Sequence, residues 1–203
     1  MVDIDRDPFF QVRRFQDERF DQEVAIIMPG EYFVSRNSII VYTVLGSCVS
    51  VCIRDTVTHI GGMNHFMLPV PKISREEDSW GESGRYGIYA MELLINDILK
   101  RGGRKERFEV KVFGGGKIYT GENDIGASNA DWILKYLHKE GLSPVQTDMG
   151  DVFPRKIYYF SDSGRVLMKK IVRIKNDTIM RREHEYKENL QKTIQTEGDV
   201  TLF

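Results

Sequence analysis

The stretch VYTVLGSCVSVCIRDTVTHIGGMNHFMLP, from Val41 to Pro69, constrains the fold more than any other part of the chain. It holds both cysteines and two of the four histidines. β-Branched and aromatic residues precede a break at Gly46 and Ser47, and side chains of alternating character follow it. The pattern predicts a buried strand, a tight break, and then two strands that pair as an antiparallel hairpin.

The register of this hairpin decides which side chains meet. A turn on residues 55–58 sets Arg54 opposite His59 and Cys48 opposite His65. Directly opposed residues have Cβ atoms roughly 4.5–5.5 Å apart, so we expect the thiol and the imidazole on one face. A slip of one residue would send the imidazole to the other face, and the two glycines of the second strand could introduce a bulge.

A cysteine beside a histidine is the minimum for nucleophilic acyl chemistry. A free thiol of pKa ~8.5 is mostly protonated at neutral pH, so Cys48 needs His65 to remove its proton. Thr43, near the end of the preceding strand, is the candidate that orients the imidazole, and the N–H groups from Gly46 to Cys48 could form an oxyanion site. The alternative is that both residues are ordinary core residues, as we expect for Cys52.

Composition and motifs exclude several other functions. The net charge is -1, which favours neither nucleic acid nor an acidic membrane, and no apolar run is long enough to cross a bilayer. The N-terminus lacks a signal-peptide core, so we expect a cytoplasmic protein with two free thiols. The run from Gly114 to Gly116 lacks phosphate-loop spacing and is expected to be a tight loop near the site. A zinc site from His59, His65 and Cys48 lacks a fourth ligand, so no cofactor or metal is expected.

The predicted elements indicate an α+β fold. Apolar residues at helical spacing predict two internal helices, one before Gly102 and one before Gly141, among several strands. We divide the chain into an N-terminal extension (1–23), a central domain (24–175) and a charged C-terminal tail that could be helical (176–203). The extension and the tail carry no catalytic candidate, so we expect both to be dispensable for chemistry.

Several motifs together resemble one known family. TVLGSCVSVCIRD, GGMNHFMLP, RYGIYAMELLINDIL, KVFGGG and IGASNADWILKYL are similar to segments of the CheD family, the chemoreceptor glutamine deamidases of bacterial chemotaxis. The similarity covers roughly residues 24–174. It implies a layered α/β/β sandwich, similar to the catalytic domain of cytotoxic necrotizing factor toxins. One departure is Asp151, which stands where the family often has the second glycine of a Gly-Gly pair.

The resemblance also implies roles for particular residues. The chain would hydrolyse selected glutamine side chains of methyl-accepting chemotaxis receptors to glutamates through a thioester. Cys48 would be the nucleophile, His65 the base and Thr43 the third member. Substrate contacts are expected from Gly46, Ser47, Asn64 and Tyr86.

The resemblance leaves a second class of function open. Some relatives bind a CheC-type phosphatase, so the chain could act mainly as a regulatory binding module that links receptors to such a partner. The presence of Cys48, His65 and Thr43 together favours the enzyme. For the enzyme, we expect residues 70–86 and the triple-glycine loop to form the rim of a pocket that receives a receptor helix.

Overall fold

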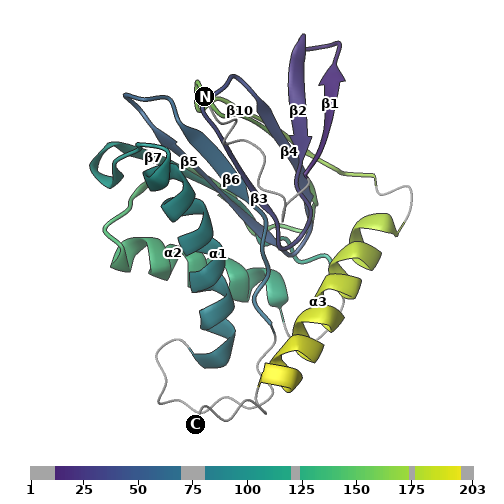
Figure 1. The fold of residues 1–203 in the computed structure, drawn as a ribbon. Coiled ribbons are helices and arrows are strands. Elements are labelled where there is room, and N and C mark those ends of the chain that lie inside the picture. The colour runs from purple at the N-terminus through teal and green to yellow at the C-terminus, as the bar shows by residue number, and fades with distance from the viewer. Residues whose placement is uncertain (1–11, 70–80, 120–123, 174–176, 198–203) are drawn as a thin grey trace.

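Two five-stranded sheets and three helices make up the part of the chain that the computed structural model describes, residues 12–69, 81–119, 124–173 and 177–197 (Figure 1). The first sheet has the order β1 (Arg13–Asp17), β2 (Gln22–Ile26), β4 (Ile40–Leu45), β9 (Arg155–Phe160), β10 (Val166–Lys170). The second has the order β3 (Tyr32–Ser35), β6 (Gly61–Asn64), β5 (Val49–Asp55), β7 (Phe108–Gly114), β8 (Pro144–Met149). The helices are α1 (Gly81–Lys100), α2 (Ile125–Lys139) and α3 (Thr178–Glu197), with a 3-10 turn at Lys105–Arg107.

Both sheets are mixed, which confirms the α+β expectation. In the first sheet β2 and β4 run parallel, and in the second β7 and β8 do; the other neighbours are antiparallel. The two expected internal helices are also present. Each ends shortly before a glycine with positive φ, Gly102 (103°) after α1 and Gly141 (69°) after α2, where a residue without Cβ terminates a helix at least cost.

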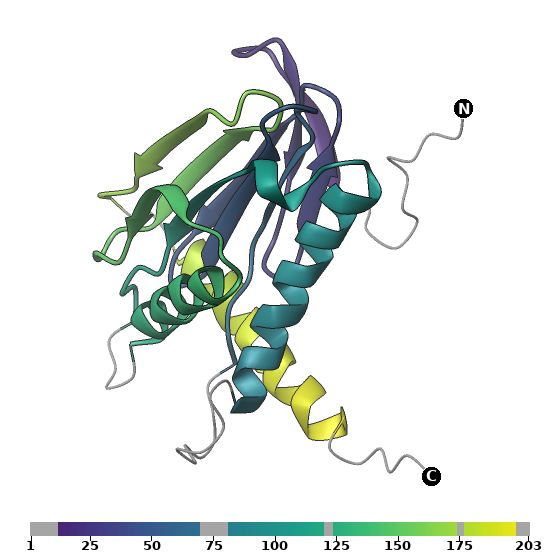
Figure 2. The same cartoon turned by 90° about the vertical axis from the view of Figure 1, so that its left-hand side faces the viewer.

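The apolar side chains form two large cores, one on each face of the second sheet, and a smaller cluster of Val24, Ile40 and Phe160 in the first sheet. On one face, Val49, Val51 and Ile53 of β5 pack with buried residues of α1 and α2. On the other, Cys48 and Cys52 pack with residues of the first sheet. The order of layers is therefore helices, second sheet, first sheet, as Figures 1 and 2 show. Alternating side chains along β5 thus divide between the two cores.

The β5–β6 hairpin is present, but the predicted register is wrong. Arg54 pairs with Gly61 instead of His59, and the bridge between Val49 and Phe66 continues the same register. The turn is longer than expected because His59 adopts a left-handed conformation (φ 57°). The Asp55 carboxylate shapes this turn by accepting the N–H groups of Val57 and Thr58 within it.

The change in register preserves the face. The predicted pairs sum to 113 and the observed pairs to 115, so the partner of each β5 residue moves by two positions along β6. Side chains alternate with a period of two, so His65 stays on the face of Cys48. Cys48 and His65 become diagonal neighbours, which lie roughly 7–8 Å apart at Cα and remain within reach of each other's side chains.

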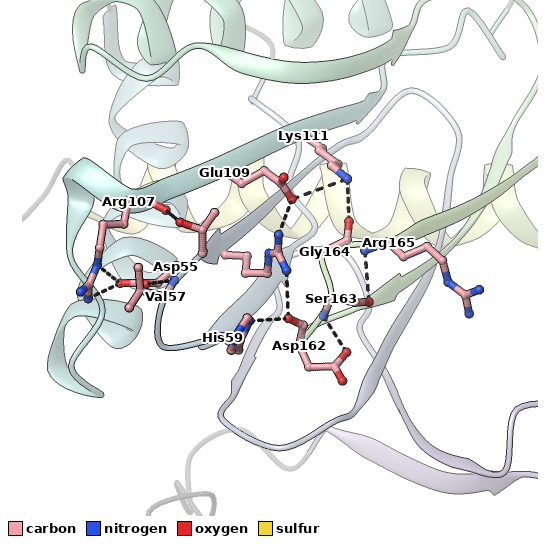
Figure 3. Close-up of polar contacts among 12 residues, drawn as sticks. Asp55, Val57, His59, Arg107, Glu109, Lys111, Asp162, Ser163, Gly164 and Arg165 are labelled. Carbon is pink, nitrogen blue, oxygen red and sulfur yellow. Dashed lines mark hydrogen bonds and ion pairs between the residues drawn. The ribbon is translucent and has the colours of Figure 1, made fainter.

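A polar network holds the end of the hairpin opposite Cys48 (Figure 3). Arg107 pairs with Asp55 at 2.6 Å, and Lys111 donates to the carbonyl of Gly164 at 2.7 Å. His59 Nδ1 lies 3.2 Å from the carbonyl oxygen of Asp162 in the same network. His59 therefore lies at the opposite end of β5 from Cys48, where the two side chains cannot bind the same metal ion.

The two ends of the described chain both join the fold. β1 is an edge strand that pairs with β2, and the expected boundary after residue 23 falls inside β2. At the other end, α3 lies across one end of the two sheets, outside the layers (Figures 1 and 2). Among the described residues, no helix is long and apolar enough to cross a bilayer.

Candidate active site

The chain crosses from one sheet to the other at the Gly46-Ser47-Cys48 segment. β4 in the first sheet ends at Leu45, and β5 in the second begins at Val49. Thr43 therefore projects between the sheets from one side, and His65 does so from the other. Cys48, His65 and Thr43 are 0%, 2% and 1% exposed. The fold thus gathers the three predicted catalytic residues in one buried space between the sheets.

Thr43 fixes the protonation pattern of His65. Its hydroxyl donates to the carbonyl of Ile27 at 2.8 Å, which leaves only lone pairs to offer the imidazole. His65 Nδ1 lies 2.7 Å from the same hydroxyl oxygen, so Nδ1 carries the proton and donates it. His65 Nε2 is buried and makes no hydrogen bond within the described part of the chain. This nitrogen is therefore the ring atom with a lone pair available as a base.

The imidazole is neutral in this structure. Burial lowers the pKa of His65 to about 3, and the opposing effect of the Ile27 carbonyl is smaller. Cys48 Sγ, a ring nitrogen of His65 and a carboxylate oxygen of Glu183 all lie within 4.8 Å of one another. A small movement of the thiol toward the neutral imidazole would bring the two groups within hydrogen-bond distance for proton transfer.

The backbone N–H groups of the crossing segment converge on the Glu183 carboxylate of α3. Gly46 N lies 2.7 Å from Glu183 Oε1, and Cys48 N lies 3.2 Å from it. The Ser47 N–H and hydroxyl donate to Glu183 Oε2 at 2.9 and 2.6 Å. Three amides and one hydroxyl thus form an anion-binding hole beside the thiol, at the place where an oxyanion would need stabilisation.

Contacts on the opposite side of the segment explain why the N–H groups point into the hole. In a trans peptide the C=O and the N–H point in opposite directions. Gly116 N–H donates to the Gly46 carbonyl at 2.8 Å, and the Asn129 amide donates to the Ser47 carbonyl at 2.9 Å. Both carbonyls are held away from the hole, so the N–H groups of Ser47 and Cys48 face it.

The triple-glycine loop is close to the site, as expected, and only glycine fits there. Gly115 N–H donates to the Cys48 carbonyl at 2.8 Å, with φ of 66° at Gly115 and 117° at Gly114. A Cβ at Gly114 would lie 2.2 Å from the Cys48 carbonyl oxygen. The loop therefore packs backbone against backbone beneath the catalytic segment.

Cys48, His65 and Glu183 resemble a metal site in residue type and in the closeness of their ligand atoms. Both oxygens of Glu183 already accept N–H or O–H hydrogen bonds. Hydrogen-bond donors, not a cation, therefore satisfy the charge of this carboxylate. The zinc set weighed from the sequence is not assembled, because His59 lies in the network at the far end of β5.

Of the four residues expected to contact substrate, two lie at the hole and two lie elsewhere. Gly46 and Ser47 form the hole. Asn64 points toward α1: its amide contacts the Ala90 carbonyl at 3.2 Å and its oxygen accepts from Val51 N at 2.9 Å. The structure therefore does not bring the Asn64 side chain to Cys48. Burial raises the pKa of Tyr186 on α3, and the charges of Cys48 and of Tyr86 on α1 raise it further, which places Tyr86 near α3. Of the expected rim, residues 70–80 lie outside the described residues.

Two residues of the site were not found from the sequence. Asn129 is fully buried in α2, where it bonds to Ser47 and also accepts from Leu68 N at 2.9 Å. Glu183 comes from the tail, where we expected no catalytic candidate, and it accepts hydrogen bonds from residues 46–48. That the tail is dispensable for chemistry stays a prediction. The available signal was a carboxylate within an apolar stripe, because Ile179, Glu183, Tyr186 and Leu190 share one helical face.

The chain is similar to one family of known proteins. A family model described as CheD chemotactic sensory transduction matches residues 67–170. A protein of Methylobacillus flagellatus named probable chemoreceptor glutamine deamidase CheD is 48% identical over 189 residues, 92% of this chain and 93% of that protein. A protein of Dechloromonas aromatica named probable chemoreceptor glutamine deamidase CheD 1 is 47% identical over 97% of both chains. The chain belongs to the CheD family. The resemblance drawn from the sequence is confirmed.

The CheD family match begins two residues after His65, whereas the alignments with the two relatives span nearly the whole chain. Asp151, which stands where the resemblance drawn from the sequence leads us to expect a glycine, adopts a left-handed φ of 66°, a conformation that glycine adopts most readily. Its carboxylate pairs with Lys170 at 3.0 Å, which helps to hold the loop in a conformation that costs a non-glycine residue energy.

Proposed function

We propose that this protein is a chemoreceptor glutamine deamidase in which Cys48 is the nucleophile, His65 the general base and acid, and Thr43 the group that orients His65. The convergence of three backbone N–H groups beside a buried Cys–His pair is the observation that carries the proposal. The printed names of its close relatives supply the substrate class.

The first half of the reaction forms a thioester. His65 Nε2 takes the proton of the Cys48 thiol, and Sγ attacks the side-chain carbonyl carbon of a receptor glutamine. The developing oxyanion accepts the N–H groups of Gly46, Ser47 and Cys48. When the carbon–nitrogen bond breaks, protonated His65 gives its proton to the departing ammonia.

The second half restores the enzyme. Water attacks the thioester carbon while His65 takes one of its protons, and the carbon–sulfur bond breaks. The sulfur leaves as thiolate and is reprotonated from His65. The net change is an amide plus water to a carboxylate plus ammonium. Because Nδ1 stays bonded to Thr43, the same Nε2 acts in every proton transfer.

Three further expectations belong to this proposal. A free thiol nucleophile needs a reducing compartment, which favours the cytoplasm. The layers of helices and two sheets support a fold similar to the catalytic domain of cytotoxic necrotizing factor toxins. A CheC-type phosphatase remains a candidate partner, and a chain that acted only as a binding module would keep its function without Cys48.

Ammonia release from purified chemoreceptor fragments tests the proposal. We expect the wild type to release ammonia and to convert particular glutamines to glutamate, which mass spectrometry detects. Cys48→Ala should abolish both signals. Cys52→Ala is the matched control, because Cys52 lies on β5, is as buried as Cys48 and packs in the same core between the sheets. Equal activity of Cys48→Ala and wild type would overturn the assignment of the nucleophile.

A further inference from the structure

The side chain of Glu183 resembles the product of the proposed reaction. That product is a glutamate, held by a protein segment, with its carboxylate beside Cys48 and its oxygens at the N–H groups of the hole. Glu183 has this chemistry, is 2% exposed and accepts three backbone N–H groups. It reaches the site from the surface of a helix without any unwinding of the α3 backbone.

The rest of α3 is also docked against the site. The residues on the same helical face as Glu183 contact the body: Ile179 lines a cavity with Thr43 and His65, Tyr186 packs against the core between the sheets, and Leu190 is buried. The hydroxyl of Tyr119 donates to the carbonyl of Met180 at 2.9 Å. A Cβ on Gly30 would lie 2.8 Å from the Tyr186 ring, so helix and body fit closely.

The opposite face of α3 has a different character. Arg181 and Glu185 form an exposed pair at 3.9 Å, and His184 and Glu188 form another at 3.3 Å. The exposed face is charged, whereas Ile179, Tyr186 and Leu190 make the docked face around Glu183 largely apolar, with Arg182 at its border, where it lines the same cavity as Ile179. A single carboxylate within an apolar face is costly to bury unless a site receives it, and the hole is that site.

The docked helix leaves the site closed. Cys48 is 0% exposed, so no substrate amide can reach Sγ while Glu183 occupies the hole. Burial, and then the charge of Glu183, raises the pKa of the Cys48 thiol well above its usual value. Access to the nucleophile and formation of the thiolate therefore both require α3 to move.

We propose that α3 is an internal competitor of the substrate, which holds Glu183 in the oxyanion hole in the place of a product glutamate and keeps the enzyme closed until a glutamine-bearing helix displaces it. This inference rests on the proposed function. It assigns the surface beneath α3 as the substrate-binding surface, and it gives the tail a regulatory role.

The sharpest test is to turn the competitor into a substrate. In full-length Glu183→Gln, the introduced amide should be placed beside Cys48 and hydrolysed to glutamate with release of ammonia. Cleavage before Asp177 and Asp199 yields peptide 177–198, in which fragment masses report position 183. Gln191 and Gln195 in the same peptide are internal controls that should stay unchanged. The second substitution Cys48→Ala should abolish the conversion.

A second test measures the closed state itself. Glu183→Ala should speed the labelling of Cys48 by iodoacetamide and the initial rate on receptor fragments, each by roughly tenfold or more, because the closed population is lost. Glu185→Ala is the matched control, since Glu185 is on the exposed face of the same helix. Labelling of Cys52 should stay slow in all variants, which shows that the core remains folded.

The outcomes separate this inference from the proposed function. Conversion at position 183 that needs Cys48, with faster labelling in Glu183→Ala, supports the inference. No conversion in a Glu183→Gln protein that still deamidates receptor fragments overturns it and leaves the proposed function standing. Conversion that persists with Cys48→Ala, or labelling rates equal in wild type and Glu183→Ala, also overturns it. If neither wild type nor Glu183→Ala releases ammonia from receptor fragments and no conversion occurs, both proposals fail.

Discussion

At the scale of single residues, the chemistry depends on which ring nitrogen of His65 carries the proton. The hydroxyl of Thr43 donates its only proton to the Ile27 carbonyl. It can therefore only accept a hydrogen bond from His65 Nδ1. This leaves Nε2 as the base. In the proposed mechanism the role of Thr43 is to position His65, and a conservative pair of variants tests such a role.

Thr43→Val should lower kcat by about fivefold, because a lost hydrogen bond is worth roughly 1 kcal/mol and about 1.4 kcal/mol is a factor of ten. KM should change little, since the side chain does not meet the substrate. Thr43→Ser keeps the hydroxyl and should retain most of kcat. Steady-state ammonia release from receptor fragments measures both constants. Loss of activity in Thr43→Ser equal to that in Thr43→Val would contradict the positioning role.

Burial of His65 also predicts a pH dependence of stability. The pKa of His65 is about 3 in the folded protein and about 6.5 in an unfolded chain. Between these values the unfolded state binds the extra proton, so stability is full above pH 6.5 and falls as the pH is lowered toward 3. The contribution of one group has a slope of at most about 1.4 kcal/mol per pH unit. Urea unfolding at several pH values measures it.

His65→Gln is the control for this pH dependence. The glutamine cannot titrate, so the difference in unfolding free energy between wild type and variant should shrink as the pH falls from 6.5. A difference that stays constant across this range would mean that His65 titrates alike in the folded and unfolded states.

At the scale of elements, the hole depends on contacts that aim one short segment of backbone. Helix α2 supplies Asn129, and the loop after β7 supplies Gly115 and Gly116, which together bind the carbonyls of residues 46–48. The N–H groups then face the other way as a consequence of peptide geometry. Helix α2 and this loop thus orient the hole without placing a side chain in it.

Asn129→Asp tests this arrangement by replacing only the side-chain NH2 group with an oxygen. The carboxylate can still accept from Leu68 N, but it cannot donate to the Ser47 carbonyl. We expect a lower kcat, because the Cys48 N–H is no longer held toward the oxyanion. Asn129→Ala should in addition destabilise the fold by about 1–3 kcal/mol, since it leaves buried polar groups unpaired. Wild-type kcat in a folded Asn129→Asp protein would refute this role.

The same contacts show what the sequence could and could not predict. Helix ends at Gly102 and Gly141 and the face shared by Cys48 and His65 follow from local chemistry and from a period of two. The register of the hairpin could not be predicted in this way, because the Asp55 carboxylate and the left-handed His59 lengthen the turn. Glu183 was missed because its partners are more than 130 residues away in the chain.

At the scale of the whole molecule, the site lies where the chain passes between two sheets and where a third element closes the opening. Thr43 comes from β4 of the first sheet, His65 directly follows β6 of the second, and Cys48 lies in the crossing between the sheets. The layered core fixes these groups, while α3 lies outside the layers and is held by one face (Figures 1 and 2). The rigid part of the fold thus holds the chemistry, and the peripheral helix controls access.

Trapping the acyl-enzyme with hydroxylamine tests the central claim, chemistry through Cys48, most directly. Hydroxylamine attacks a thioester and converts the acyl group to a hydroxamate, which mass spectrometry distinguishes from glutamate. We predict hydroxamate at the same receptor glutamines that become glutamate without hydroxylamine, in wild type and in Cys52→Ala but not in Cys48→Ala. Glutamate formed at those positions at an undiminished rate, with no hydroxamate at any hydroxylamine concentration, would contradict acylation of Cys48 and require direct attack by water.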